Sequence, residues 1–170
     1  EELIEAVKEL ELDEIVDILQ NLPEERMNKI LSNMSLVDRR RIEIGLTFPD
    51  NTAGGLLNTD VISVRPNNSI NEVISYLRDQ ADLPENTDKI FVVNNENEYL
   101  GELLISKIIT SKPSMLVREI METEFPSIDA DLDDKEVATL FERNDLISSP
   151  VVDKDGKLIG RITIDDVVDV

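Results

Sequence analysis

The sequence predicts a chain of mixed α and β structure: a short all-α N-terminal segment, then a tandem pair of βαββα units related by a pseudo-twofold axis. Two observations lead to this prediction. Apolar residues recur at helical spacing over residues 1–48, and one pattern of strand, turn, strand and capped helix occurs twice in residues 49–170. Because neither unit is large enough to bury both faces of its sheet alone, we expect the two copies to pack as one module.

The N-terminal segment is predicted to form three or four short amphipathic helices. Apolar side chains stand three or four positions apart in residues 3–10, 12–22 and 27–34. Pro23 suits the first turn of a helix, and Ser35 with Asp38 has the spacing of a capping box. The Pro, Asn and paired Gly of residues 49–57 then predict a linker that reverses the chain.

The repeated unit is clearest at the end of the chain. Pro150–Val152 reads as a buried strand, Asp153–Gly156 as a turn and Leu158–Ile164 as a second strand. Thr163 then opens a helix, and Asp166, three residues on, completes a capping box. Two further capping boxes are expected at equivalent helix starts in the two copies, at Ser69 with Glu72 and at Asp133 with Glu136.

Two different offsets relate the copies. Val92 corresponds to Val151 and Gly101 to Gly160, 59 residues apart, whereas Val64 corresponds to Ile128 at an offset of 64. The first copy therefore carries five extra residues, which we place in the polar stretch 81–89 because insertions fall in surface loops. The predicted domains are 1–48 (helical), 49–57 (junction), 58–114 (first repeat) and 115–170 (second repeat).

The amino-acid composition excludes several classes of function. The chain has 37 acidic and 17 basic residues, a formal net charge of −20, which disfavours nucleic-acid binding and favours cations. Cys and His are absent, so a disulfide, a thiol nucleophile, the usual zinc site and imidazole catalysis are excluded. The sequence has neither a phosphate-binding loop nor a nucleophile elbow, and we predict no enzymatic activity. No apolar run approaches the roughly 20 residues that span a bilayer.

Several carboxylates have spacings that could gather a cation. Asp13 and Asp17 lie four residues apart on one predicted helix, Asp166 and Asp169 lie three apart on the last helix, and Asp145 precedes the Pro150 strand. Like charges at this spacing repel, and Mg²⁺, which needs only one or two carboxylates and keeps its waters, would relieve the repulsion. The alternative is a set of separate solvated faces.

The repeated unit and several segments outside it resemble a known family. The tandem unit, whose second copy reads P-V-V-D…G-K-L-I-G-R-I-T-I-D-D-V, resembles a pair of cystathionine-β-synthase (CBS) motifs. Three further segments resemble MgtE-type magnesium transporters: L-D-E-I-V-D-I-L of the first helices, A-G-G-L-L of the junction, and I-T-I-D-D-V-V-D-V at the end. The resemblance covers essentially all of the chain.

This resemblance implies a Mg²⁺-sensing gate at the cytoplasmic face of the cell membrane. It implies a homodimer formed through the CBS pairs and a C-terminal transmembrane domain in the parent protein, which this chain lacks. Mg²⁺ would hold the closed state, with Asp13 and Asp17 as ligands on the helical domain. On the CBS side the implied ligands are Asp145, Asp166 and Asp169.

CBS pairs also bind adenine nucleotides such as ATP, with a T/S-x-x-D aspartate holding the ribose. The second copy has this motif, Thr163 to Asp166, whereas the first has Lys107 in place of the aspartate. That substitution weighs against nucleotide binding, and Asp166 could instead act only as a helix cap. A nucleotide-sensing module that regulates another partner, and an acidic dimerisation module without ligand, therefore remain as alternatives.

Overall fold

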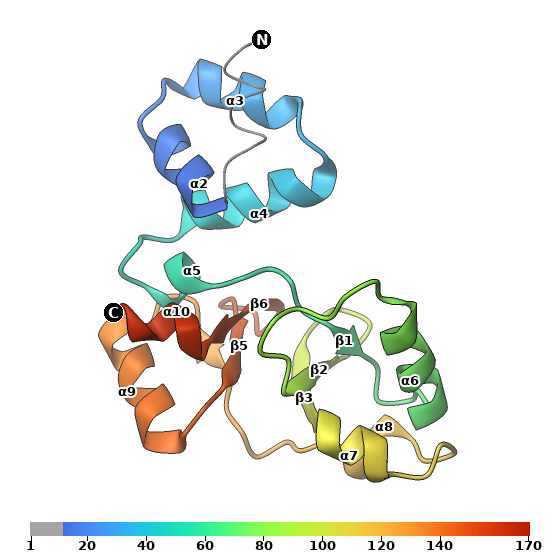
Figure 1. Ribbon diagram of the computed structural model, residues 1–170. Coiled ribbons are helices and arrows are strands. Elements are labelled where there is room, and N and C mark those ends of the chain that lie inside the picture. The colour runs from blue at the N-terminus through green and yellow to red at the C-terminus, as the bar shows by residue number, and fades with distance from the viewer. Residues whose placement is uncertain (1–11) are drawn as a thin grey trace. The chain divides into compact units, whose positions relative to one another are not determined.

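The computed structural model describes residues 12–170, apart from the side chains at positions 12, 13, 17, 37, 40 and 41. The chain forms two compact units, residues 1–50 and 51–170 (Figure 1). Of the helices that the structure describes, none combines the length and the apolar character that crossing a membrane requires.

The described part of the first unit contains three helices. They are α2 (Leu12–Gln20), α3 (Glu24–Ser32) and α4 (Leu36–Thr47). Their apolar faces meet in one core, whose buried side chains are Ile15, Val16, Leu19, Ile30, Leu31 and Ile42. A Cβ on Gly45 would lie 2.7 Å from Val16 Cγ2, so this glycine permits the close approach of α4 to α2. The predicted helix over residues 3–10 lies outside the described residues.

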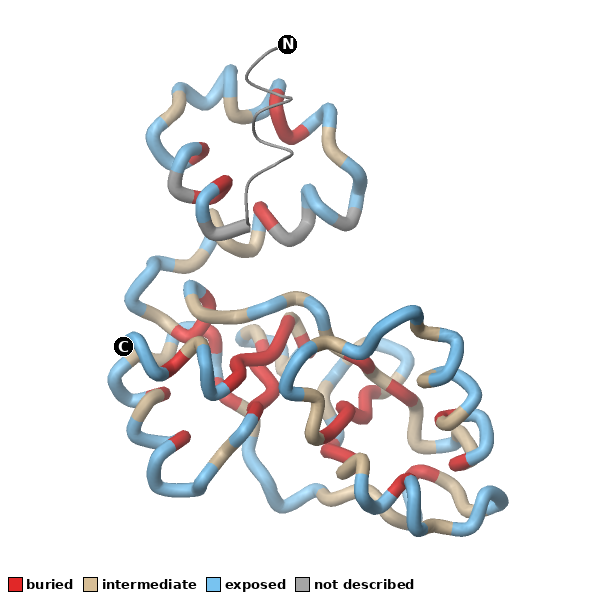
Figure 2. Tube along the Cα trace, viewed as in Figure 1, coloured by how far each residue is buried: buried red, intermediate tan, exposed pale blue. Residues whose placement is uncertain are grey.

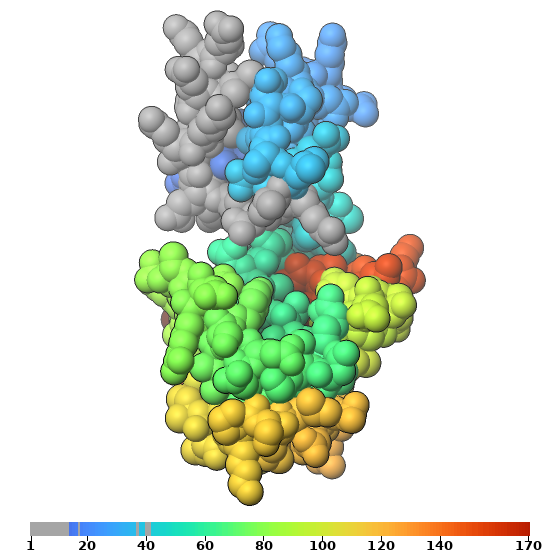
Figure 3. All heavy atoms as spheres, turned by 90° about the vertical axis from the view of Figure 1, so that its right-hand side faces the viewer, coloured from blue at the N-terminus to red at the C-terminus, as the bar shows by residue number. Residues whose placement is uncertain are grey.

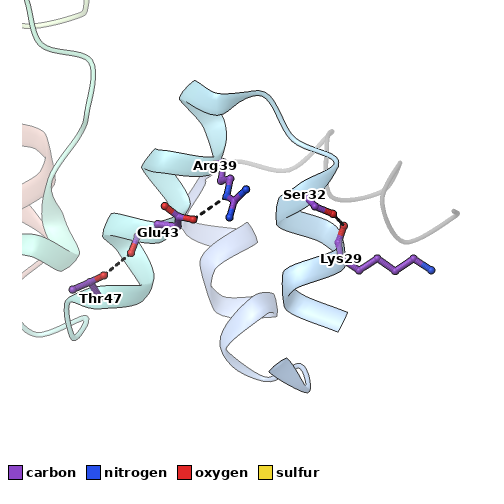
Figure 4. A network of polar contacts seen from close by, with 5 residues as sticks. All are labelled: Lys29, Ser32, Arg39, Glu43 and Thr47. Atoms are coloured by element: carbon purple, nitrogen blue, oxygen red, sulfur yellow. Dashed lines mark hydrogen bonds and ion pairs between the residues drawn. The ribbon is translucent and has the colours of Figure 1, made fainter. Parts of the chain in front are cut away.

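Local polar contacts support these helices. On α4, Arg39 Nε lies 2.9 Å from Glu43 Oε1, and Thr47 Oγ1 donates to the Glu43 carbonyl at 2.7 Å (Figure 4). Ser35 Oγ accepts from the Asp38 amide at 3.2 Å, which is one half of the predicted capping box. Exposed pairs of this kind contribute only a few tenths of a kcal/mol each, so the apolar core carries most of this unit's stability.

The second unit consists of the two predicted repeats. The first contains β1 (Ser63–Val64), α6 (Ile70–Asp79), β2 (Lys89–Val93), β3 (Tyr99–Leu104) and α7 (Ile105–Thr110). The second contains β4 (Ile128–Asp129), α9 (Asp134–Asn144), β5 (Ser148–Val152), β6 (Leu158–Thr163) and α10 (Ile164–Val168). The predicted fold class is confirmed.

Each repeat forms a three-stranded sheet with the same topology. In both, the first strand pairs parallel to the second and the second antiparallel to the third. The register also repeats, since Val92 pairs with Gly101 and Val151 with Gly160, each followed by an irregularity. The offset of 59 read from the sequence therefore reflects equivalent places in two sheets.

The central strands are buried on both faces, as their apolar runs require. Ile90 and Val92 of β2 pack into the helical core of the first repeat, whereas Phe91 and Val93 face the seam between the repeats. Phe91 contacts Tyr99 edge to face there, with ring centroids 6.4 Å apart. Figure 2 shows these strands as the buried interior of the unit, with the exposed surface on the helices around them.

The segments that lead into each repeat pack on the other repeat. Helix α5 (Ala53–Leu56) precedes the first repeat, yet it is bonded to the second. The Ala53 amide donates to the Leu132 carbonyl and the Gly54 amide to the Ala130 carbonyl, each at 2.8 Å. Helix α8 (Val117–Ile120) precedes the second repeat, and its buried Val117 belongs to the core of the first. The junction is thus partly helical, which the sequence reading missed.

One predicted cap is wrong in detail. Asp133 accepts a hydrogen bond from the Lys135 amide at 3.0 Å rather than forming a reciprocal box with Glu136. An Asp cap can accept from either the second or the third amide of a helix, and here it accepts from the second. The Ser69 and Glu72 box is confirmed: the Glu72 amide donates to Ser69 Oγ at 3.1 Å, and Glu72 Oε1 accepts from the Ser69 amide at 3.4 Å.

Candidate functional site

Polar groups gather where β6 ends and α10 begins. We call this place the Asp166 corner and define it by five residues: Asn58, Arg161, Thr163, Asp165 and Asp166. Oδ2 of Asp166 accepts three hydrogen bonds, from the Thr163 amide, the Thr163 hydroxyl and Asn58 Nδ2, each at 2.9 Å. The predicted reach of Asp166 back to Thr163 is therefore confirmed, and a residue of the leading segment adds a third donor.

The two carboxylates of the corner have different surroundings. Burial raises the pKa of Asp166, although the hydrogen bonds from Thr163 and the charge of Arg161 oppose this shift. The Asp165 carboxylate is exposed, accepts from Asn86 Nδ2 at 3.0 Å, and shares with Asp166 the single proton of the Thr163 hydroxyl. The corner therefore holds two adjacent carboxylates whose charges are met mainly by neutral amide and hydroxyl donors.

Arg161 is the one cation of the corner and is only 5% exposed. Its guanidinium donates to the Asn86 carbonyl at 3.0 Å and to the Glu85 carbonyl. Burial lowers its pKa, and the nearby carboxylates of Asp166, Asp88, Asp60 and Asp165 oppose that shift. Among the described residues its buried Nε has no hydrogen-bond partner. Arg161 is not among the residues that the sequence predicts for the site, because an arginine within a strand pattern is usually solvent-exposed.

The equivalent place in the first repeat has different chemistry. At the same offset, Glu102 replaces Arg161, Leu104 replaces Thr163 and Lys107 replaces Asp166. Glu102 is buried and pairs with Lys89, whose Nζ lies 3.2 Å from Glu102 Oε2. Burial raises the pKa of Glu102, and Lys89 opposes the shift. The pseudo-twofold relation therefore holds for the backbone but not for these side chains.

The predicted metal ligands lie within helices or at their ends. Asp145 ends α9 in a left-handed conformation and is exposed, and Asp169 ends α10 and is also exposed. Asp13 and Asp17 belong to α2, but their side chains lie outside the described part. Among the described residues, no three acidic side chains gather as the ligands of one metal ion.

Comparisons with known proteins cover both units. Residues 1–51 match the MgtE intracellular N domain, and residues 53–112 and 117–170 each match the CBS domain. The magnesium transporter MgtE of Thermus thermophilus is 33% identical over 94% of this chain and 36% of its own length. The magnesium transporter MgtE of Bacillus subtilis is 27% identical over 97% of this chain and 37% of its own. The chain thus spans little more than a third of these curated relatives.

A solved structure extends the likeness to three dimensions. The cytosolic domain of the Mg²⁺ channel MgtE, solved in complex with ATP, is 31% identical, with a TM-score of 0.84. The match covers 98% of this chain and 68% of that one.

Proposed function

The chain belongs to the MgtE family, whose intracellular N domain and CBS pair it contains, and we propose that it is the Mg²⁺-sensing regulatory region of a magnesium transporter. One observation carries the proposal. The likeness to the cytosolic domain of the Mg²⁺ channel MgtE runs through 98% of the chain and so includes the helical unit as well as the CBS pair. A CBS pair alone would not favour magnesium over other ligands.

Charge supplies the proposed mechanism. A net charge of −20 means that acidic surfaces repel one another when Mg²⁺ is scarce. Two carboxylates about 4 Å apart repel by roughly 4 kcal/mol at an effective dielectric constant of 20. Mg²⁺ bound to such carboxylates would remove the repulsion and hold the closed state of a transport domain in the parent protein. We propose Asp13, Asp17, Asp145, Asp166 and Asp169 as its ligands.

A direct test is calorimetric titration of the chain with MgCl₂ at constant ionic strength. We expect saturable binding with a Kd near 1 mM, about −4 kcal/mol, because isolated carboxylates that leave several waters on the ion bind weakly. Asp166→Asn should weaken binding. Asp155→Asn, which removes the same charge from an exposed turn, should not. Equal effects of the two variants would contradict a specific site at Asp166.

A second candidate function is adenine-nucleotide sensing, and the Asp166 corner favours it. Thr163 and Asp166 have the spacing of the ribose-binding motif, and Asp166 has one carboxylate oxygen, Oδ1, outside the three hydrogen bonds described above. Ile147 and Ile164, the first residue of α10, are joined by a 2.8 Å backbone hydrogen bond, expose 47% and 37% of their surface, and could contact an apolar base. Titration with ATP in place of MgCl₂ tests this function separately.

We also propose that two copies associate through the CBS pairs. Apolar residues are exposed at repeat-equivalent positions on the outer helices: Ile109 (75%) of α7 corresponds to Val168 (72%) of α10. Tyr76 (44%) of α6 likewise corresponds to Leu140 (36%) of α9. A second copy would cover these side chains. The relatives are named as transporters, and we propose for this region a regulatory rather than a catalytic role at the cytoplasmic face of the membrane.

A further inference from the structure

The loop that carries the five extra residues of the first repeat lies next to the Asp166 corner. The loop Leu83–Asp88, which we call the cover loop, precedes β2 and belongs to the first repeat. Its end is fastened to both repeats: the Asp88 carbonyl accepts from the Ile105 amide at 3.0 Å, and Ser148 Oγ donates to Asp88 Oδ1 at 2.5 Å. In Figure 3 the yellow-green atoms that precede β2 lie directly against the red atoms of α10.

Residues in the middle of the cover loop form hydrogen bonds with the Arg161 guanidinium and the Asp165 carboxylate, two groups that could otherwise contact a ligand at the corner. The carbonyls of Glu85 and Asn86 accept from both terminal nitrogens of Arg161. The Asn86 amide donates to Asp165 Oδ1 at 3.0 Å. Arg161 is thereby 95% enclosed, and the surface of the corner presents carboxylates without an accessible cation.

We propose that the cover loop is a lid on the Asp166 corner, held closed by Arg161 and Asn86, and that an anionic ligand enters only when it opens. Opening would free the guanidinium of Arg161, including the buried Nε that has no partner among the described residues, for the oxygens of a phosphate. Opening would also free Asp165 from Asn86. With the lid closed, the two carboxylates would repel a phosphate. The ligand part of this inference rests on the proposed nucleotide function; the closed lid does not.

Asn86 offers a clean substitution because its φ of 57° lies in the left-handed region, where glycine keeps the backbone unchanged. Asn86→Gly removes only the amide that holds Asp165. Asn97→Gly is a matched control, since Asn97 has a φ of 64° and its side chain donates to the Leu158 carbonyl in the seam, away from the corner. Both variants place a glycine at a left-handed position, so faster exchange confined to Asn86→Gly cannot come from a general effect of such a substitution on the chain.

The experiment is hydrogen–deuterium exchange of the cover-loop amides in the full chain without ligand. Loss of one hydrogen bond should speed exchange of residues 85–88 about three- to tenfold in Asn86→Gly. Asn97→Gly should leave that exchange at the wild-type rate. Unchanged exchange in Asn86→Gly, or an equal increase in both variants, would overturn the lid.

Repeating the exchange experiment with ATP tests the lid and the nucleotide-sensing function separately. We expect faster exchange of the wild-type cover loop with ATP bound, and tighter ATP binding by Asn86→Gly than by Asn97→Gly. ATP binding that leaves the exchange of the loop unchanged would overturn the lid while supporting nucleotide sensing. If no variant binds ATP, the nucleotide function fails, and the ligand-free exchange rates alone decide whether the lid exists.

Discussion

At the scale of single residues, Asp166 makes one contact beyond the helix cap that the sequence predicts. It caps α10 through Thr163, and it also accepts from Asn58, which lies 108 residues away. A cap alone would not need the distant donor. The sequence could identify the local partner because capping follows a fixed spacing. It could not identify Asn58, because that contact depends on how the repeats pack.

Burial of Asp166 has a consequence for pH dependence. Its pKa is raised in the folded chain, so the folded state holds this proton more tightly than the unfolded state does. The contribution of Asp166 to stability is therefore fully present below its unfolded pKa of about 3.9 and is lost as the pH rises through the higher folded pKa. The variant Asp166→Asn does not titrate, so its stability does not fall in this way as the pH rises, and its side chain keeps an oxygen that can accept hydrogen bonds.

We predict that the unfolding free energy of Asp166→Asn, relative to wild type, increases between pH 3.5 and pH 7. The change should stay below about 1 kcal/mol, because solvent screens a half-exposed group. Urea unfolding at several pH values measures it, with Asp155→Asn as the control for loss of charge. A relative stability that stays constant or falls with pH would show that Asp166 is not destabilised by its burial.

Gly160 gives a steric prediction. A Cβ at this position would lie 2.5 Å from the Asn58 carbonyl oxygen and 2.6 Å from Leu57 Cδ1. Gly160→Ala should therefore push the leading segment off β6 and lower the unfolding free energy by about 1–3 kcal/mol. Thermal unfolding measures the loss. Gly156→Asn serves as the control, because that turn is open and Asn tolerates its positive φ; losses of equal size would refute the steric explanation.

At the scale of secondary-structure elements, the strands and the caps of α6 and α10 could be predicted from local pattern. Pro150–Val152, the following turn and the second strand lie where alternation and turn residues indicated. Two things escaped this reasoning. Helix α5 has only four residues, including Gly54 and Gly55, and forms because its amides bond to the other repeat. Arg161 is buried because the inserted loop of the first repeat covers it, which is a tertiary effect.

The exchange of leading segments explains why the repeats need each other. The Asn58 and Arg161 backbones exchange two hydrogen bonds, of 2.7 and 2.8 Å, and Glu122 and Glu102 do the same in the other repeat, at 2.8 and 2.9 Å. Each leading segment therefore extends the sheet of its neighbour along β6 or β3. A chain cut between the repeats would lose both extensions.

The buried pair of β2 and β3 allows a prediction about charge in this interior. Lys89 and Glu102 are both more than nine-tenths buried and 3.2 Å apart. Glu102→Gln leaves Lys89 charged and poorly compensated and should cost about 3 kcal/mol of stability. Replacing the two together, by Lys89→Met and Glu102→Leu, should cost much less, because neither charge of this buried pair then remains. Denaturant midpoints distinguish the cases; a double variant as unstable as the single one would contradict this account.

At the scale of the whole molecule, the acidic charge and the exposed apolar side chains have opposite effects on the association of two copies. A charge of −20 keeps copies apart, whereas the exposed Ile109 and Val168 favour their contact. Cations that screen or bind the carboxylates would shift this balance toward association. The offsets in the sequence already match Ile109 with Val168, but the exposure of these side chains could not be read from the sequence until the helices were placed on the sheets.

We predict that the chain sediments as a dimer, at about twice its mass of 19.2 kDa, and that Ile109→Glu shifts it toward the monomer. A charge in a desolvated apolar contact is strongly unfavourable. Leu36→Glu is the control, since Leu36 is 84% exposed but lies outside the repeats. Sedimentation velocity measures the distribution; a wild-type monomer, or equal dissociation by both variants, would contradict association through the CBS pairs.

The central claim, that this region senses Mg²⁺, is tested most directly by thermal unfolding in MgCl₂ against NaCl at equal ionic strength. An ion that binds only the folded chain adds about 1.4 kcal/mol at ten times its Kd, which raises the Tm by a few degrees. We predict this gain for Mg²⁺ beyond the gain in NaCl, and a smaller gain for Asp166→Asn. Equal stabilisation by the two salts would mean that the acidic surfaces are merely screened, and would contradict the claim.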